Sequence, residues 1–318
     1  MMMDEERVWQ RLQLSQAAQA LDILGGAGVP CMLLKGAAGL AAGWLLPGER
    51  RLTDVDVLLP PAQLSEAVAL LVEHGWPSVF RTPSAPDARR HSQAMCSRWG
   101  FLLDLHWFAL RHARWAGVDD ILWQGAAPAL LDGVEVLVPS AEDFLVHTIA
   151  HGVRRGSSGA LWRQDVRTLL AGRAVNLNWA RVIKTSENYR VSPLVARALE
   201  AVAEELPSKI PKDVCEDLRK LPLRWRDRVF LQLTTDRLDE AGFLQALVLV
   251  LDYLRTRPAP WLDMPGGFID FLRDRWELRS RASVLGQIGA VAVWGLQSEV
   301  RRARERFQNW RGKNRGRV

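Results

Sequence analysis

Two aspartates stand one residue apart in the segment RLTDVDVLL, residues 51–59, whose other residues are mostly apolar. In a β-strand, residues i and i+2 point to the same side, so Asp54 and Asp56 face one way and the valines after them face a core. Two carboxylates about 5 Å apart repel by roughly 3 kcal/mol at an effective dielectric near 20. A strand that carries both needs compensation, from a shared proton, from basic side chains or from a bound divalent cation.

Two other segments supply groups that suit compensation by a bound divalent cation. The apolar run CMLL is followed by Lys35 and Gly36, and a small-residue segment typical of a helix comes next. Free backbone N–H groups at the start of such a helix, with the positive end of its dipole behind them, can hold phosphate. Asp104 lies in a later strand segment, LLDLHW. Three carboxylates on adjacent strands beside a phosphate-holding turn predict a site for two magnesium ions that bridge a nucleoside triphosphate.

In this order, the segments LLKG, RLTDVDVLL and LLDLHW resemble the uncharacterised nucleotidyltransferases of the DNA-polymerase-β-like superfamily, over about residues 30–170. The resemblance implies that Asp54 and Asp56 bind the metal. It implies that Asp104 is the third carboxylate of the site, which positions or deprotonates the acceptor hydroxyl. The implied cofactor is Mg²⁺ or Mn²⁺, and the implied substrate is a nucleoside triphosphate such as ATP.

The expected nucleotide-binding residues are Lys35, Gly36, Ala37 and Arg51. Gly36 matches the turn glycine of the superfamily, but Ala37 stands where a serine is common. The phosphate would then be held by backbone N–H groups and by Lys35. For Arg51, contact with phosphate and pairing with a neighbouring carboxylate are equally open.

Further histidines and one aspartate are candidates for a substrate cleft. They are His91, His106, His147, His151 and Asp165. His106 would share a strand face with Asp104, and His147 and His151 would share a helix face. A structural hydrogen bond, core packing or a solvated loop is an alternative reading for each of them.

Composition fits a soluble globular protein of two domains, because 48% of the 318 residues are hydrophobic and 25% are charged. Three widely spaced cysteines, Cys31, Cys96 and Cys215, suit neither a disulfide framework nor a zinc site and predict a reducing compartment. The N-terminal segment begins acidic, unlike a signal peptide, and the apolar run 288–296 is too short to span a bilayer. We therefore expect a cytoplasmic protein without a transmembrane segment.

The net charge of +6 is located at one end of the chain. Residues 299–318 hold eight basic and two acidic side chains, which equals the whole net charge, so the remainder is balanced. This distribution does not support a nucleic-acid-binding face spread over the fold. RNA is an open but disfavoured partner.

Hydrophobic periodicity predicts strands first and helices later. Strands are expected at 31–34, 52–59, 76–81, 92–98, 100–108 and 134–139, with helices at 7–25, 37–46 and 61–74. Beyond Ser140, which with Asp143 forms a predicted capping box, the pattern is helical. Helices are expected near 160–171, 178–187, 192–205, 223–255, 267–279 and 284–310.

Together these patterns predict the α+β class: a minimal nucleotidyltransferase mixed sheet with flanking helices, followed by an all-helical domain. The expected divisions are a nucleotidyltransferase domain at 1–139, a helical domain at 140–310 and a basic disordered tail at 311–318.

The expected activity is transfer of a nucleoside monophosphate to a hydroxyl or phosphate of a small molecule, peptide or protein, with release of pyrophosphate. Two alternatives stay open. One is a non-catalytic nucleotide-binding module, which the alanine at position 37 favours. The other is a toxin-type nucleotidyltransferase that acts on tRNA, for which the basic tail would bind the substrate.

Overall fold

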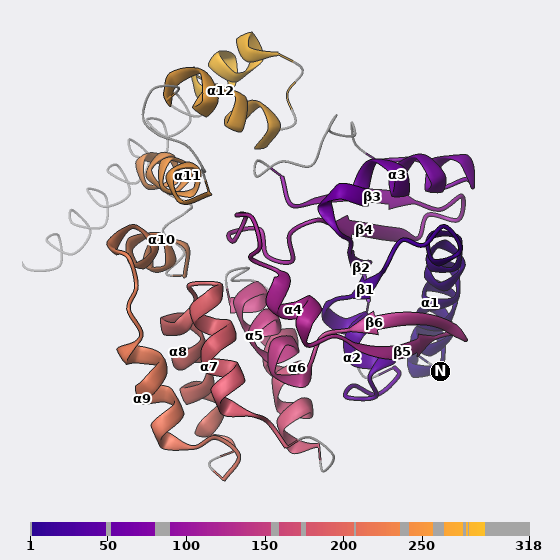
Figure 1. Cartoon of the computed structure of the whole chain (residues 1–318), viewed down its shortest axis with the longest axis horizontal. Helices are drawn as coiled ribbons and strands as arrows, with labels where there is room; N and C mark the ends of the chain where they lie inside the picture. Colours follow the sequence, from indigo (N-terminus) through magenta and orange to yellow (C-terminus); the bar gives the residue numbers. More distant parts are fainter. Residues whose placement is uncertain are drawn as a thin grey trace, which may run out of the picture. The chain divides into compact units, whose positions relative to one another are not determined.

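The computed structural model describes residues 2–48, 52–79, 90–153, 159–172, 176–206, 208–235, 242–256, 264–275, 278 and 280–289 (Figure 1). The chain divides into two compact units, residues 1–227 and 228–318. The β-sheet lies in the first unit, and the described part of the second unit is helical.

The first unit is built on a six-stranded mixed sheet with the strand order β3-β4-β2-β1-β6-β5. The strands are β1 (Met32–Leu33), β2 (Val55–Leu58), β3 (Ser92–Cys96), β4 (Leu102–His106), β5 (Ala127–Leu131) and β6 (Val134–Val138). β2 runs parallel to β4 and antiparallel to β1, whereas β1 runs parallel to β6. β3 pairs with β4 and β5 with β6, both antiparallel. The predicted α+β class with a mixed sheet and flanking helices is confirmed.

Two strand assignments differ from the sequence pattern. Of the segment expected at 76–81, Ser78 makes only an isolated bridge to Met95, and residues 80 and 81 lie outside the described part. The edge strand β5 was not expected from the pattern. Its sequence, APALL, shows no clear alternation of apolar and polar residues. It also contains Pro128, which lacks an N–H and is tolerated here because one side of an edge strand is unpaired.

Helices cover the sheet. α1 (Met2–Gly26) packs along β2, β5 and β6 and contacts α3 (Leu64–Glu73), which follows the short 3₁₀ turn η1 (Pro61–Gln63). α2 (Lys35–Ala41) contacts β1, β2 and β5 and also α5 (Ala141–Gly152). A Cβ on Gly39 would lie 2.6 Å from Leu45 Cδ1 and 3.1 Å from Phe144 Cζ on α5, so a larger residue would displace the Leu45 side chain and crowd Phe144.

Beyond the sheet, the first unit continues as helices α5, α6 (Gly159–Ala171), α7 (Trp179–Asn188), α8 (Ser192–Ala203) and α9 (Lys212–Lys220). The cap of α5 is as predicted, since Ser140 Oγ accepts the N–H of Asp143 at 3.2 Å. α9 was not expected, because most of its residues are charged and only three of them are buried. The domain boundary at residue 139 stays a prediction, although α5 to α9 belong to the same compact unit as the sheet.

Of the helix expected over 223–255, the structure describes two parts, α10 (Trp225–Thr235) and α11 (Gly242–Thr256), and residues 236–241 lie outside the described part. The second unit also contains α12 (Met264–Arg275) and a helical segment at 281–289. Its core is formed by Tyr253, Phe271, Leu272 and Val284. The predicted tail at 311–318 lies outside the described residues. In the part that the structure describes, no helix combines the length and the apolar character needed to cross a bilayer.

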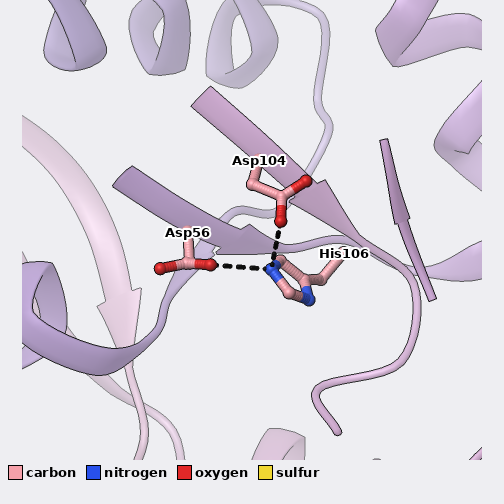
Figure 2. Close-up of side chains that lie close together, drawn as sticks. All are labelled: Asp56, Asp104 and His106. Atoms are coloured by element: carbon pink, nitrogen blue, oxygen red, sulfur yellow. Dashed lines mark hydrogen bonds and ion pairs between the residues drawn. The ribbon is translucent and has the colours of Figure 1, made fainter. Parts of the chain in front are cut away.

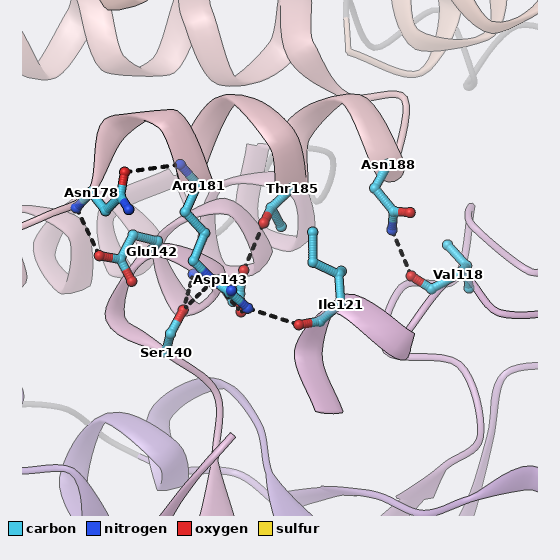
Figure 3. Close-up of polar contacts among 9 residues, drawn as sticks. All are labelled: Val118, Ile121, Ser140, Glu142, Asp143, Asn178, Arg181, Thr185 and Asn188. Carbon is cyan, nitrogen blue, oxygen red and sulfur yellow. Dashed lines mark hydrogen bonds and ion pairs between the residues drawn. The ribbon is translucent and has the colours of Figure 1, made fainter. Parts of the chain in front are cut away.

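A polar cluster joins α7 to α5 and α4 (Asp120–Gln124) (Figure 3). The fully buried carboxylate of Asp143 accepts hydrogen bonds from Arg181 Nη2 at 2.5 Å and from Thr185 Oγ1 at 2.7 Å. Arg181 Nη2 also donates to the carbonyl of Ile121 at 2.8 Å. The Asp143 side chain therefore pairs with α7 and does not return to the N–H of Ser140 as a complete capping box would.

A second buried carboxylate holds the β4–α4 loop, residues 107–119. Asp119 Oδ2 accepts the N–H of Ala109 at 3.1 Å, and its Oδ1 accepts the hydroxyl of Tyr189 at 2.6 Å. His147 on α5 donates from Nε2 to the carbonyl of Ala109 at 3.0 Å. Burial raises the pKa of Asp119 to about 6, although the bonds from Tyr189 and Ala109 oppose the shift. The chain just after β4 is thus fixed at both backbone groups of one residue.

Replacing Arg181 by methionine should lower the free energy of unfolding by about 3 kcal/mol, because it leaves the buried Asp143 carboxylate without its cation. Urea denaturation measures this loss. Arg167→Met is the matched control: its guanidinium pairs with Glu205 on the surface at 2.8 Å, so the expected loss is under about 1 kcal/mol. Equal losses in the two variants would contradict the prediction.

The pKa of Asp119 predicts a pH dependence of stability. Because the folded-state pKa of about 6 lies above the ordinary 3.8, the folded protein holds this proton more tightly than the unfolded chain. The stabilisation is complete below about pH 4 and is lost as the pH rises through 6, by up to about 3 kcal/mol. Urea denaturation of the wild type and of Asp119→Asn at pH 4 and pH 7 measures it. The stability difference between the two proteins should change by this amount, and a constant difference would refute the assignment.

Candidate active site

The sheet register places two of the three predicted carboxylates side by side. Asp56 on β2 is the register partner of Asp104 on the parallel strand β4, so both side chains project from the same face. His106 follows Asp104 by two residues and shares that face. Figure 2 shows both carboxylates directed at one nitrogen of its ring. His106 Nε2 lies 2.8 Å from Asp56 Oδ1 and 3.1 Å from Asp104 Oδ2.

The hydrogen bonds of His106 assign its charge. Nε2 faces two carboxylates, and Nδ1 lies 3.3 Å from the carbonyl oxygen of Phe108. Since all of these partners are acceptors, both ring nitrogens carry protons and the ring is an imidazolium. Burial alone would lower the pKa of His106, but Asp104 and Asp56 together raise it to about 9.

Lys35 supplies a second positive charge to the same carboxylate. Its Nζ forms an ion pair with Asp56 Oδ1, the oxygen that also contacts His106. Burial would raise the pKa of Asp56, but Lys35 and His106 more than reverse this and hold it well below its usual range. Asp56 is therefore a buried, ionised carboxylate with two cationic partners.

The backbone aims Lys35 at this position. β1 pairs with β2 so that Leu33 faces Val57, and the N–H of Leu34 donates to the carbonyl of Asp56 at 2.9 Å. Lys35 then adopts a left-handed conformation with a φ of 50°, which is uncommon for a residue with a side chain. The turn at the end of β1 is thus made by Lys35, and such unfavourable conformations persist where surrounding contacts enforce them.

Asp54 lies at the margin of the site. β2 begins at Val55, so the strand pleat does not constrain Asp54, and its Oδ1 accepts the hydroxyl of Thr53 at 2.8 Å. Burial raises its pKa, and the charge of Asp56 raises it further while Lys35 opposes the shift. Asp54 is close enough to sense both charges, but it is not part of the compact Asp56, Asp104 and His106 group.

The other expected nucleotide-binding residues lie at the start of α2, with one exception. Gly36 and Ala37 are buried in its first turn. The N–H of Ala38 donates to the carbonyl of Leu34 at 3.2 Å, so the N–H groups of Gly36 and Ala37 precede the helical ladder. Arg51 lies outside the described residues.

Of the candidate cleft residues, His91 contacts His106 at the site, whereas His147 and His151 lie on α5 and Asp165 lies on α6. His91 meets His106 edge to face, with ring centroids 5.3 Å apart, and loss of hydration together with the charge of His106 keeps its pKa well below the usual value. His147 is buried, and burial lowers its pKa to about 4, so it is a neutral donor to the β4–α4 loop. The ring of His151 stacks on that of His147, with ring centroids 6.1 Å apart, and Asp165 is buried on α6.

The donor set suits a divalent cation. Asp56, Asp104 and His106 each offer one ligand atom, and these atoms lie within 4.8 Å of one another. Carboxylate oxygens are the ligands that Mg²⁺ prefers and that also suit Mn²⁺, whereas the His106 imidazolium could ligate a metal ion only after losing a proton. The cationic partners of Asp56 are the feature that sequence reasoning missed. Their contact depends on the β1–β2 register and on the left-handed Lys35, neither of which leaves a local sequence pattern.

Comparisons with known proteins were made for the whole chain. Residues 3–207 match the family described as uncharacterised nucleotidyltransferase. No curated protein sequence matches the chain.

Several solved structures are similar to the chain at low identity. An antigenic nucleotidyltransferase-like protein from Paracoccidioides brasiliensis is 18% identical, over 69% of this chain and 95% of that one, with a TM-score of 0.41. The antibiotic-resistance factor ANT(2'')-Ia in solution is 14% identical, over 62% and 97%, with a TM-score of 0.37. ANT(2'')-Ia in complex with adenylyl-2''-tobramycin is 16% identical, over 65% and 97%, with a TM-score of 0.36.

The family match spans more than half of the chain and includes both carboxylates of the site and the lysine that pairs with one of them. The protein belongs to the uncharacterised nucleotidyltransferase family.

Proposed function

We propose that this protein transfers a nucleoside monophosphate from a nucleoside triphosphate to a hydroxyl or phosphate of an acceptor, with release of pyrophosphate, and that it requires Mg²⁺ or Mn²⁺. The acceptor would be a small molecule, a peptide or a protein. The observation that carries the proposal is the pairing of Asp56 with Asp104 across adjacent parallel strands, next to Lys35 and the start of α2.

The chain's own residues would divide the work. Asp56 and Asp104 would hold the divalent cation, with Asp54 contributing from the margin of the site. When bound, the cation would neutralise phosphate oxygens and lower the pKa of the acceptor hydroxyl. Asp104 is the more accessible carboxylate, with 21% of its side chain exposed against 4% for Asp56, so it is better placed to accept the acceptor's proton.

The phosphates would be held at the start of α2. The N–H groups of Gly36 and Ala37 and the ammonium of Lys35 are the donors there, and Arg51 remains a proposed contact. The alanine at position 37 offers no hydroxyl to phosphate. Backbone N–H groups and one lysine would therefore carry the recognition of the triphosphate.

Asp56→Asn should reduce nucleotidyl transfer by about 100-fold or more, because it removes the most buried negative charge of the cation site. The assay incubates each α-³²P-labelled nucleoside triphosphate with Mg²⁺, the protein and cell extract, and follows label into acceptors. Label from γ-³²P-labelled nucleotide should leave as pyrophosphate. The control is Asp217→Asn on the exposed face of α9, which should label like the wild type.

Equal labelling by Asp56→Asn and the wild type would contradict the proposal. Nucleotide binding without any labelling would favour a non-catalytic binding module instead, and labelling confined to tRNA would favour the toxin-type alternative.

Removal of divalent cations should abolish labelling. Adding Mg²⁺ or Mn²⁺ after the EDTA treatment should restore it, because the carboxylate oxygens of Asp56 and Asp104 suit both ions. Transfer rates measured across a titration of each metal test this. Undiminished transfer in EDTA would contradict a metal-dependent mechanism.

A further inference from the structure

Two cationic side chains contact one oxygen of a buried carboxylate. Lys35 Nζ and His106 Nε2 both lie against Asp56 Oδ1, and His106 also contacts Asp104 Oδ2. A carboxylate oxygen has about two lone-pair positions, so these two donors use both positions of Oδ1. A divalent cation can bind Asp56 Oδ1 only if one of the two cationic side chains moves away.

The two cationic side chains differ in their freedom to move. The His106 ring is almost fully buried on β4, and its second nitrogen is directed at the carbonyl of Phe108. That carbonyl precedes Ala109, the residue that Asp119 and His147 fix at both backbone groups. The imidazolium is therefore held in place by its surroundings.

Lys35 has more freedom. It occupies the first position of α2, its side chain is 13% exposed, and its ammonium ends a flexible four-carbon stem with freely rotating donors. A lysine with this freedom can leave Asp56 and turn toward the phosphates of a bound nucleotide. The same ammonium can thus pair with the carboxylate or with the triphosphate.

We propose that Lys35 keeps free divalent cations away from Asp56 until nucleotide is present, and that its ammonium then moves from Asp56 to the triphosphate. This inference rests on the proposed function and adds an order of binding. The divalent cation binds Asp56 together with the nucleotide and not before it. A cation that binds alone meets the ammonium at short range. A cation that arrives with the triphosphate brings negative charge that pairs with the ammonium.

The inference predicts effects of opposite sign from one substitution. Lys35→Met should bind Mn²⁺ in the absence of nucleotide at least about tenfold more tightly than the wild type, because a unit positive charge next to the ligand oxygen is removed. The same variant should bind a non-hydrolysable ATP analogue about tenfold more weakly at saturating Mn²⁺, because a phosphate partner is lost. By linkage, the analogue should tighten Mn²⁺ binding to the wild type more than to Lys35→Met.

Mn²⁺ binding is measured by electron paramagnetic resonance of the free ion, and analogue binding by calorimetry, so neither readout depends on turnover. Lys184→Met, on the exposed face of α7, is the matched control for the loss of one positive charge and should bind both probes like the wild type. Lys35→Arg should keep the wild-type order of binding, since the charge is retained. Lys35→Gln provides a second neutral variant that can still donate to Asp56, in case the methionine variant does not fold.

Two outcomes separate this inference from the function on which it rests. If both neutral variants bind Mn²⁺ no more tightly than the wild type while the wild type still transfers label, the inference fails and the proposed function stands. If the wild type binds neither Mn²⁺ nor the analogue, alone or together, both are overturned.

Discussion

The buried charge of Asp56 is the constraint around which the sheet is organised. An ionised carboxylate inside a protein costs several kcal/mol unless it is paired and hydrogen-bonded. Asp56 meets this requirement through Lys35 from the end of β1 and His106 from β4. Both partners reach it only because β2 lies between β1 and β4 in the sheet, antiparallel to one and parallel to the other. The strand order and the compensation of this charge are therefore one structural requirement.

Helices outside the sheet support Lys35 and His106 indirectly, through the backbone segments that carry or contact them. α2 packs against α5, where Gly39 lies close to Phe144, and this contact supports the helix that begins at Lys35. On the other side, Asp119 and His147 hold the loop whose carbonyl faces His106. Both contacts involve α5, so the helices that follow the sheet contribute to the position of the two cations around Asp56. The helices α5 to α9 belong to the same compact unit as the sheet.

The cationic partners of Asp56 also determine how the charge of the site is compensated before a ligand binds. Without a ligand, the cationic partners make the site neutral enough to be stable, in place of the repulsion that two adjacent aspartates would otherwise suffer. Basic partners and a divalent cation therefore do not exclude each other as compensation for the two carboxylates. Basic side chains satisfy the carboxylates in the free protein, and a metal with its nucleotide would replace part of that compensation. Family membership supports the transferase chemistry, whereas the acceptor is decided by surfaces that this arrangement does not define.

Local patterns in the sequence determined the α+β class, the cap of α5 at Ser140 and the shared face of Asp104 and His106, because each depends on residues a few positions apart. Tertiary structure decided what the patterns could not contain. Asp54 lies at the margin because β2 begins one residue after it. Lys35 reaches Asp56 because strand register and a left-handed backbone bring together residues 21 positions apart. Such contacts are set by which strands pair and in what register, and alternation along one strand carries no record of its neighbours.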